Sequence, residues 1–368
     1  MTVYYVCPYR FVSFGIVANK HIQELRKYTE VLPVPEQDLD RGIVIKPNST
    51  VIVHPLFYVF MGDRDWMYTF RIRRLHKLQQ YNPTIIAFDV ADTNRISPKA
   101  VDLANKVDVV CVPSGFCKRV YIESGVKTRV EVVPHGLSPT FINKPKEITS
   151  PIIRKLLQEK KDNNYIYILY FLLHSGYRKG ADLVYDAVGQ IQQMYDNVIL
   201  LVKRTEIVDP FLLELRRLRT IEIAGFLNEQ HLVELYDIAD ITIVPSRGGG
   251  FELNALESIA RGIPTLVTSK GCFEDYLQYT IPIKVAKEEP IFKNNPVHVG
   301  NGYTCDIEDF VDKLKNTIEN LDEYKARFSQ YRKVIVQEYT WENVGRKIWN
   351  IIQDRHPKVS EMASLPSL

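Results

Sequence analysis

The chain has 368 residues, of which 45% are hydrophobic and 25% are charged. Its 47 basic and 44 acidic residues leave a formal net charge of +3, so no strong basic field marks it as a nucleic-acid-binding protein. The length is sufficient for two α/β domains, each with its own core.

The cysteines and the apolar segments indicate where the protein works. The five cysteines are scattered, without a Cys-x-x-Cys pair, which predicts reduced thiols inside a cell and no structural zinc. The longest apolar run, 165–173, is too short to cross a bilayer, and the N-terminus lacks the features of a secretory leader. We expect a cytoplasmic protein and leave peripheral membrane contact open.

Short β-rich apolar runs alternate with helical patterns along the whole chain, which is typical of parallel sheets. In the first half, strands are predicted at 3–6, 51–54, 85–88, 107–112 and 130–133, and helices near 17–28, 64–80, 97–105 and 115–124. In the second half, strands are predicted at 165–173, 198–202, 221–224, 241–244 and 265–268, and helices near 306–320, 322–338 and 341–354.

These two series predict two domains. A Rossmann-like domain over 1–145 is followed by a second one over 146–340, with a linker within 139–150. A last helix over 341–356 and a disordered tail over 357–368 complete the chain. Because doubly wound domains bind ligands at the carboxyl ends of their strands, we expect the functional site in a cleft between the domains.

The most informative motif follows the predicted strand 241–244. It contains the triglycine Gly248-Gly249-Gly250 and then a helix that carries Glu257 on an apolar face. Glycines let backbone N–H groups approach a ligand, and a helix N-terminus adds unpaired donors and a positive dipole end. These features suit a phosphate or a sugar ring, and the Glu257 carboxylate could accept hydroxyl donors from a ribose. The alternatives are a flexible loop and a glutamate at the edge of an exposed face.

A second motif follows the predicted strand 165–173. Arg178 and Lys179 lie in a glycine-bearing loop, and a helix is predicted from Gly180. Two cations where a parallel strand passes into a helix are well placed to neutralise a diphosphate. The alternative is a solvated basic loop, but the triglycine motif in the same half favours the phosphate role.

The first domain supplies its own candidates. His54 and Asp89 each end an apolar strand, and Asp92 and Arg95 follow soon after. Since the carboxyl ends of parallel strands face the cleft, all four are candidates for contact with the donor sugar or an acceptor. A buried structural histidine is the competing interpretation of His54. His135 is expected to be structural, at the hinge between the domains.

The segment 66–81 mixes apolar and basic residues on one predicted helix. The apolar residues recur at helical spacing and the basic ones crowd between them: Met67, Phe70, Leu75 and Leu78, with Arg71, Arg73, Arg74, His76 and Lys77. Aromatic anchors with a basic face suit a helix on an anionic lipid surface, and an ordinary amphipathic helix is the alternative. We expect no metal site, because Asp63-Arg64-Asp65 fits a helix start, with aspartate at the N-cap and in the first turn.

Three blocks of the second half resemble, in order, the donor domain of glycosyltransferase family 4, a family of retaining GT-B enzymes. The blocks are Arg178-Lys179-Gly180-Ala181-Asp182-Leu183, Ala239-Asp240-Ile241-Thr242-Ile243-Val244-Pro245-Ser246 and Gly250-Phe251-Glu252-Leu253-Asn254-Ala255-Leu256-Glu257. Segment 132–137 resembles the end of the family's first domain. Segment 339–342 resembles the start of its final helix, which crosses back to that domain. The resemblance spans nearly the whole chain and implies the GT-B fold, two Rossmann-like doubly wound α/β domains facing across a cleft.

The resemblance also implies roles for individual residues. Lys179, assisted by Arg178, would bind the diphosphate of a nucleotide-sugar donor, and Glu257 would contact its ribose. The other donor-binding positions would line the sugar and phosphates at Gly250, Phe251, Leu253 and Asn254, the base at Gly225, Phe226 and Leu227, and the phosphates from the first domain at Gly15.

The chain departs from the family pattern at two places. The first glutamate of the family's Glu-x7-Glu pair falls at Gly249. Glu252, where the family usually has glycine, is our candidate for supplying that acid from a shifted position. The Gly-Arg that many members carry before the lysine motif is replaced by 172–174, so we expect His174, Ser175 or Arg178 to substitute for it.

The implied reaction is that of a retaining hexosyltransferase. A sugar would pass from a UDP- or GDP-sugar to a hydroxyl of a sugar, lipid-linked or protein-linked acceptor, without a metal or other cofactor. In such enzymes the leaving diphosphate is thought to help deprotonate the attacking hydroxyl, so the protein's task is to stabilise charge on that diphosphate. The departures leave open a nucleotide-sugar-binding subunit without catalysis. A sugar-nucleotide epimerase or a phosphorylase on the same frame is the other alternative.

Overall fold

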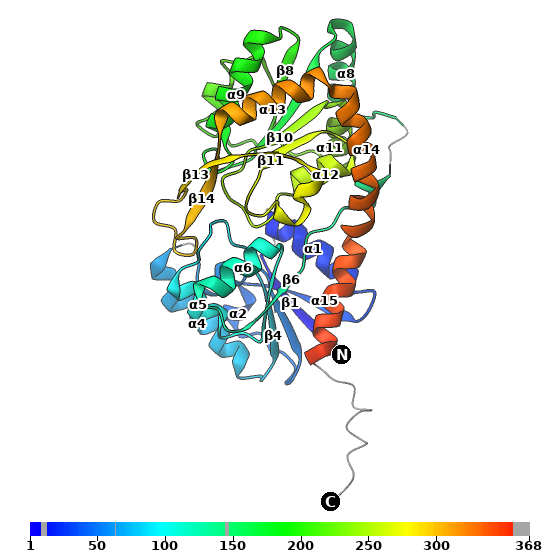
Figure 1. Cartoon of the computed structure of the whole chain (residues 1–368). Coiled ribbons are helices and arrows are strands. Elements are labelled where there is room, and N and C mark those ends of the chain that lie inside the picture. The colour runs from blue at the N-terminus through cyan, green and yellow to red at the C-terminus, as the bar shows by residue number, and fades with distance from the viewer. Residues whose placement is uncertain (9–12, 63, 144–146, 356–368) are drawn as a thin grey trace, which may run out of the picture.

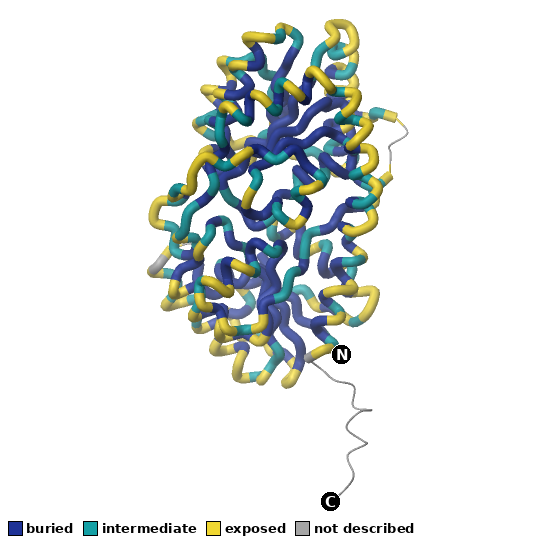
Figure 2. Tube along the Cα trace, viewed as in Figure 1, coloured by how far each residue is buried: buried dark blue, intermediate teal, exposed yellow. Residues whose placement is uncertain are grey.

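The computed structural model describes residues 1–8, 13–62, 64–143 and 147–355. It contains two six-stranded sheets, one in each lobe, and a separate two-stranded hairpin. Figure 1 shows the N-terminal lobe in blue and cyan below the C-terminal lobe in green to orange. The central strands of both sheets are buried along most of their length, as Figure 2 shows. The prediction of two Rossmann-like α/β domains is therefore confirmed.

The first sheet has the order β2-β1-β3-β4-β5-β6, and all of its neighbouring strands are parallel. The strands are β1 (Thr2–Cys7), β2 (Glu30–Pro35), β3 (Thr50–Val53), β4 (Thr84–Phe88), β5 (Val109–Val112) and β6 (Arg129–Val132). The five predicted strands are confirmed. The sequence missed β2, an edge strand whose two prolines and partly exposed residues interrupt the apolar pattern.

The helices of the first domain agree with the four predicted ones and add two short ones. They are α1 (Ser13–Leu25), α2 (Asp38–Arg41), α3 (Leu56–Phe60), α4 (Asp65–Gln79), α5 (Pro98–Ala104) and α6 (Gly115–Ser124). Ser97 and Ser114 fix the starts of α5 and α6, because their side chains accept hydrogen bonds from backbone N–H groups of the first turn. α1 begins earlier than expected, so Gly15, which precedes the predicted helix 17–28, is buried in the first turn of this helix.

The second sheet has the order β12-β11-β10-β7-β8-β9 and is also parallel throughout. Its strands are β7 (Ile166–Leu172), β8 (Val198–Arg204), β9 (Thr220–Ile223), β10 (Ile241–Val244), β11 (Thr265–Thr268) and β12 (Ile281–Ile283). Its helices are α7 (Pro139–Ile142), α8 (Pro151–Asn163), α9 (Ala181–Met194), α10 (Leu212–Leu215), α11 (Glu229–Ile238), α12 (Leu253–Ala260) and the 3-10 helix η1 (Glu274–Tyr279). The five predicted strands are confirmed, and only the three-residue β12 was missed.

A hairpin that the sequence did not predict joins the two lobes. Its strands, β13 (Val285–Pro290) and β14 (Asn301–Cys305), pair antiparallel. The hairpin extends from the upper lobe towards the lower one in Figure 1, and its loop bonds to residues 94–97 of the first domain. The Ser97 N–H donates to the Val297 carbonyl at 2.8 Å, and the Asn94 N–H to the Asn301 carbonyl at 2.9 Å. The β13 sequence is largely charged and exposed, so it lacks the alternation that predicts a strand.

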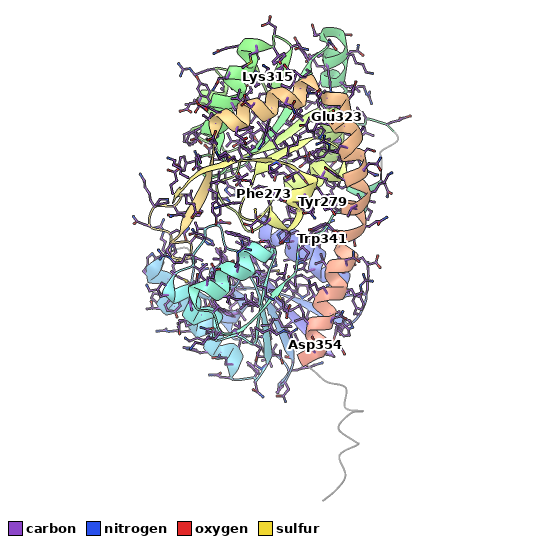
Figure 3. The ribbon with its side chains drawn as sticks, viewed as in Figure 1. Phe273, Tyr279, Lys315, Glu323, Trp341 and Asp354 are labelled. Atoms are coloured by element: carbon purple, nitrogen blue, oxygen red, sulfur yellow. The ribbon has the colours of Figure 1, made fainter. Side chains whose placement is uncertain are left out.

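The last three helices are α13 (Ile307–Glu319), α14 (Leu321–Glu338) and α15 (Trp341–Arg355). α14 runs down the side of the upper lobe, and α15 continues along the lower one. Figure 3 places Trp341 where the lobes meet and Asp354 near the base. Apolar residues of α15, among them Ile348 and Ile352, join a core with β1, α1 and one face of the first sheet. The last helix therefore crosses back as expected, and the tail 357–368 lies outside the described residues.

The crossing of α15 meets the end of the first domain at a tight contact. The Leu137 N–H donates to the Tyr339 carbonyl at 2.8 Å. A Cβ on Gly136 would lie 2.4 Å from the Trp341 nitrogen, so only glycine fits there. The His135 ring packs 6.2 Å from the Trp341 ring, which agrees with a structural histidine at the hinge.

The expected linker within 139–150 is held against the second domain in its described part. The buried Arg261 guanidinium donates to the carbonyls of Phe141 and Asn143 at 2.8 and 2.7 Å. The same side chain forms a two-point ion pair with Asp237. This residue therefore anchors the start of the connection between the lobes.

We expect Gly136→Ala to lower the free energy of unfolding by about 1–3 kcal/mol, because backbone of the α15 crossing occupies the space for a Cβ. The matched control is Gly189→Ala in α9, where the nearest atom is the flexible Leu218 Cδ2 at 3.4 Å. The control should be neutral or stabilising, since alanine favours a helix over glycine. Thermal unfolding of both variants gives the measurement, and an unchanged midpoint for Gly136→Ala would contradict the tight crossing.

Candidate active site

A cavity of about 290 Å³ opens between the two domains, where the sequence predicts the cleft. Both domains and the hairpin loop contribute to its wall. Its polar lining residues are Asp89, Asp92, His174, Ser175, Arg178, Asn295 and His298, and its aromatic ones are Phe14, Phe57, Tyr58 and Phe292. The structure thus brings together Asp89 and Asp92 from the first domain and Ser175 and Arg178 from the second, as the sequence suggests.

Lys179 and Glu252 form an ion pair beside this cavity. The Lys179 ammonium contacts the Glu252 Oε1, and the Glu252 side chain is only 5% exposed. The Ser246 hydroxyl donates to the same oxygen at 3.0 Å. Glu252 immediately precedes α12, so the pair links the motif after β7 to the motif after β10. In this state the charge of Lys179 is balanced from within the protein.

Glu252 lies close to where a side chain at position 249 would begin. A Cβ on Gly249 would be 2.6 Å from the Glu252 Oε1 and 3.7 Å from the Arg178 Nη1. A carboxylate is therefore present next to the position that lacks one in the sequence pattern. This geometry supports Glu252 as the replacement, and its role in a reaction stays a prediction.

Arg178 is buried and keeps part of its hydrogen-bonding capacity free. Its Nη1 donates to the Gly248 carbonyl at 2.8 Å and lies 3.9 Å from the Asp92 Oδ2. Its Nε is buried and has no hydrogen-bond partner among the described residues. A buried donor without a partner is costly, so an oxygen of a bound ligand would gain free energy by meeting it.

The triglycine turn packs against the first domain. A Cβ on Gly248 would lie 2.1 Å from the Asp92 carbonyl oxygen, and one on Gly250 would lie 2.4 Å from the Val90 Cβ. The Ser114 hydroxyl donates to the Gly250 carbonyl at 3.0 Å. In this structure the turn is packed between the domains, so it is neither the phosphate cradle nor the flexible loop that the sequence suggested. Its glycines are required because the two domains approach each other here.

Two carboxyl groups in the cleft differ in charge state. Burial raises the pKa of Asp89 to about 7, although backbone N–H groups of Phe57 and Val90 stabilise its charged form. For Asp92, burial works against ionisation, but Arg178 and other nearby cations hold its pKa below the usual value. One acid that titrates near neutrality thus lies near one that stays charged.

The hairpin loop supplies site residues that the sequence did not reveal. The His298 Nδ1 accepts a hydrogen bond from the Asp92 N–H at 3.3 Å, and its ring stacks on Phe292. Burial lowers the pKa of His298, which favours its neutral form. Phe292 also lies against Arg178, 5.9 Å from its guanidinium carbon. The sequence of this loop contains no recognisable motif. It reaches the cleft through its backbone hydrogen bonds to the first domain, which the sequence does not reveal.

His54 and Arg95 require correction. His54 is 3% exposed and does not line the cavity; its Nδ1 lies 3.1 Å from the Tyr5 hydroxyl, in a stack with His21. Burial lowers the pKa of His54 to about 3, so it fits the structural interpretation and not the catalytic one. Arg95 is also absent from the cavity lining. Its carbonyl accepts the N–H groups of Val299 and Gly300, which holds the hairpin loop.

The expected donor-binding residues lie at the carboxyl ends of β9 and β10. Glu257 Oε2 accepts the Tyr236 hydroxyl at 2.8 Å, and burial raises the pKa of Glu257 to about 8. Gly225 has a φ of 82°, which favours glycine, and the following Phe226 is 80% exposed. The remaining positions are Leu227, which is half-buried after β9, Phe251, whose ring packs on His135, and Leu253 and Asn254, which open α12.

The sequence also gave expectations about metal sites and about membrane-spanning segments, which involve residues outside the cleft. The described residues contain no group of three or more His, Cys, Asp or Glu side chains arranged to hold a metal ion. Asp63 lies outside them, and α4 begins at Asp65 with Arg64, not an aspartate, at its N-cap. No described helix is long and apolar enough to span a membrane.

Comparison with known sequences now bears on this site. A family model described as family 4 glycosyltransferases in conflict systems matches residues 216–348, which include the triglycine turn and Glu257. Putative glycosyltransferase 45 of Sulfolobus islandicus filamentous virus is 27% identical over 272 residues, which cover 71% of this chain and 72% of that protein. These matches support a GT4-like glycosyltransferase. Uncharacterized protein 356 of Sulfolobus islandicus rod-shaped virus 1 is 29% identical over 366 residues, 96% of this chain and 98% of the relative.

Solved structures agree on the fold of this glycosyltransferase. Anabaena HepE, whose crystal structure is a complex with UDP-glucose, superposes with a TM-score of 0.69 over 96% of this chain and all of HepE (100%). Sequence identity in that pair is 13%, so the likeness concerns the fold alone. The expected GT-B fold is confirmed.

The pH dependence of stability tests the buried carboxyl of Glu257. Its folded-state pKa of about 8 lies above the ordinary value of 4.5, so the folded protein holds the proton more tightly than the unfolded chain. This group therefore lowers the free energy of unfolding as pH rises from 4.5 towards 8. Glu257→Gln should gain stability relative to the natural protein across that window, by up to about 1.4 kcal/mol per pH unit.

Glu234→Gln is the control of opposite sign. Although burial works the other way, bonds from the N–H groups of Thr149 and Ser150 lower the pKa of Glu234 to about 2. Its stabilisation is present above pH 4.5 and is lost as pH falls towards 2, so this variant should be less stable at neutral pH. Urea unfolding between pH 4 and 9 measures both, and a pH-independent difference for Glu257→Gln would exclude a buried neutral carboxyl.

Proposed function

We propose that this glycosyltransferase moves a hexose from a nucleoside diphosphate sugar to an acceptor hydroxyl with retention of anomeric configuration. The proposal rests mainly on one observation: Arg178 lines the cavity between the domains, and the Lys179–Glu252 ion pair lies close to it across Gly249. The resemblance to family 4 in the donor domain and the UDP-glucose complex of HepE support the choice of donor.

The diphosphate would bind at Lys179 and Arg178. Two phosphate groups could draw Lys179 away from Glu252, since an oxyanion is an equally good partner for the ammonium. The free Arg178 Nε would meet another phosphate oxygen. Fixed cations in a partly buried site stabilise the charge that grows on the leaving diphosphate more strongly than water does, and this is the main catalytic contribution we assign to the protein.

The sugar would lie between the diphosphate and the first domain. Glu252, released from Lys179, could then accept sugar hydroxyl donors from the position that Gly249 leaves open. Asp89 and Asp92 line the opposite wall and would orient the acceptor hydroxyl. The bond from the anomeric carbon to the leaving oxygen breaks while the acceptor oxygen bonds to the same face. The acceptor proton passes to a phosphate oxygen.

The nucleoside would extend along the carboxyl ends of β9 and β10. Glu257 would accept the ribose hydroxyls, and its protonated form would still offer one carbonyl oxygen. The exposed Phe226 ring and the backbone around Gly225 would meet the base, which we propose to be uracil or guanine. The acceptor is proposed only as a hydroxyl compound.

Lys179→Ala tests the diphosphate site. We expect the affinity for UDP or GDP to fall about tenfold to a hundredfold, because one charge-assisted contact is lost. The increase in unfolding temperature with UDP-, GDP- and ADP-sugars identifies the preferred base, because a bound ligand stabilises the folded protein. Release of nucleoside diphosphate in the absence of an acceptor measures cleavage of the bond between the sugar and the diphosphate. Lys155→Ala, which removes an exposed lysine of α8, should leave both readings unchanged.

Glu252→Gln separates binding from chemistry. It keeps Lys179 available, so affinity for the nucleoside diphosphate should hold or improve while donor cleavage falls. Magnetic resonance of the first-formed sugar shows its configuration, and we expect that of the donor. Binding without turnover in the natural protein would overturn the transferase in favour of a binding subunit, and an inverted product would overturn retention alone.

A further inference from the structure

The helix α4 presents two aromatic side chains to solvent. Trp66 is 63% exposed and Phe70 is 61% exposed, while Leu75 and Leu78 of the same helix are buried. The two exposed rings lie one turn apart with their centroids at 6.4 Å, in an edge-to-face arrangement. Phe70 faces outward, away from the leucines that pack on the core.

Cations surround this aromatic pair. A surface hollow of about 550 Å³ is lined by Trp66, Met67, Phe70, Arg71, Arg73, Arg74, Lys77 and Asp40, and we call these residues the α4 surface. Its four cations and one carboxylate carry about as much net charge as the whole chain, which has +3. The remainder of the protein is thus nearly neutral. The lining of this hollow thus has an excess of positive charge.

The cations have different tasks. Arg74 is buried and forms a two-point ion pair with Asp40 at 2.9 and 2.5 Å, so it serves the fold. Arg71 stacks over the Tyr58 ring at 4.7 Å. Arg73 extends over the outward Phe70, with its guanidinium carbon 5.8 Å from the ring centroid. Lys77, although it donates to backbone carbonyls of α2, keeps an exposed position.

We propose that the α4 surface docks the protein on an anionic lipid membrane. Tryptophan and phenylalanine gain free energy where headgroups meet acyl chains, and Arg73 and Lys77 would meet lipid phosphates beside them. Charge complementarity favours an anionic membrane. The only carboxylate of the described lining, Asp40, is already paired with Arg74, so no free negative charge in that lining opposes anionic lipid headgroups.

The docked orientation would bring the membrane to the rim of the active site. Gly62 lines the cleft cavity, and a Cβ on it would lie 2.8 Å from the Cβ of Met67, which lines the α4 surface. The two hollows therefore come close to each other at Gly62 and Met67. An acceptor hydroxyl carried by a lipid could enter the cleft from this side. That consequence rests on the proposed function, whereas docking itself does not.

Co-sedimentation of the full chain with lipid vesicles tests the proposal. We expect binding to vesicles of phosphatidylcholine mixed with phosphatidylglycerol, little binding to phosphatidylcholine alone, and a decrease with added salt. Trp66→Ala and Phe70→Ala should each weaken binding severalfold. Arg73→Glu should weaken it by about tenfold or more, since each basic residue near the surface contributes to attraction.

Two matched controls locate the effect. Lys155→Glu reverses an exposed charge on α8, and Phe226→Ala removes an exposed ring at the donor site. Neither should change vesicle binding. An equal loss for Lys155→Glu, equal binding to neutral vesicles, or no binding to anionic vesicles would each overturn the proposal. Self-association that Trp66→Ala abolishes would instead assign the surface to a second copy of the chain. Nucleotide binding should stay intact in the α4 variants, so failure here is distinguishable from failure of the transferase proposal.

Discussion

The close approach of the triglycine turn to the first domain is the constraint on which the site depends. Gly248 and Gly250 have no room for side chains against Asp92 and Val90. Because these backbones touch, Asp92 comes within reach of Arg178, and the cavity acquires walls from both lobes. A pair of larger residues would separate the lobes and open the cleft to water. The glycines thus set the dielectric environment in which the charged groups act.

The buried cations of the site are balanced by carboxylates of the protein itself. Burying a cation is costly unless it is paired, and the chain pairs Lys179 with Glu252 and places Arg178 near Asp92. A donor diphosphate would substitute for carboxylates that already neutralise these cations, so its binding does not require an unpaired buried charge beforehand.

Much of the fold could be predicted because long apolar strands alternate with helices, whereas β2 and β13 were missed because their prolines and charges hide the strand pattern. At the site, Lys179, Arg178 and Glu252 were predicted from a cation pair and a motif whose residues are close in sequence. The contribution of His298 was not predictable, since a hairpin loop reaches the cleft only through its contacts with the first domain. For His54 the sequence predicted a position in the cleft that the structure does not show. Its place at the end of a strand suggested the cleft, but its side chain packs with Tyr5 and is not among the residues that line the cavity.

The crossing of α15 determines the order in which the two lobes can complete their cores. One face of the first sheet is covered by α15, which a ribosome synthesises after the strands of both sheets. The N-terminal lobe therefore cannot complete its core before α15 has emerged, even though all of its sheet strands emerge much earlier. The C-terminal lobe can form first, and α15 then packs on the first sheet and completes the core of the N-terminal lobe. A fragment cut at the linker would leave apolar surface of the first sheet in water, so a separable N-terminal lobe would have to include α15 in addition to the residues before the linker.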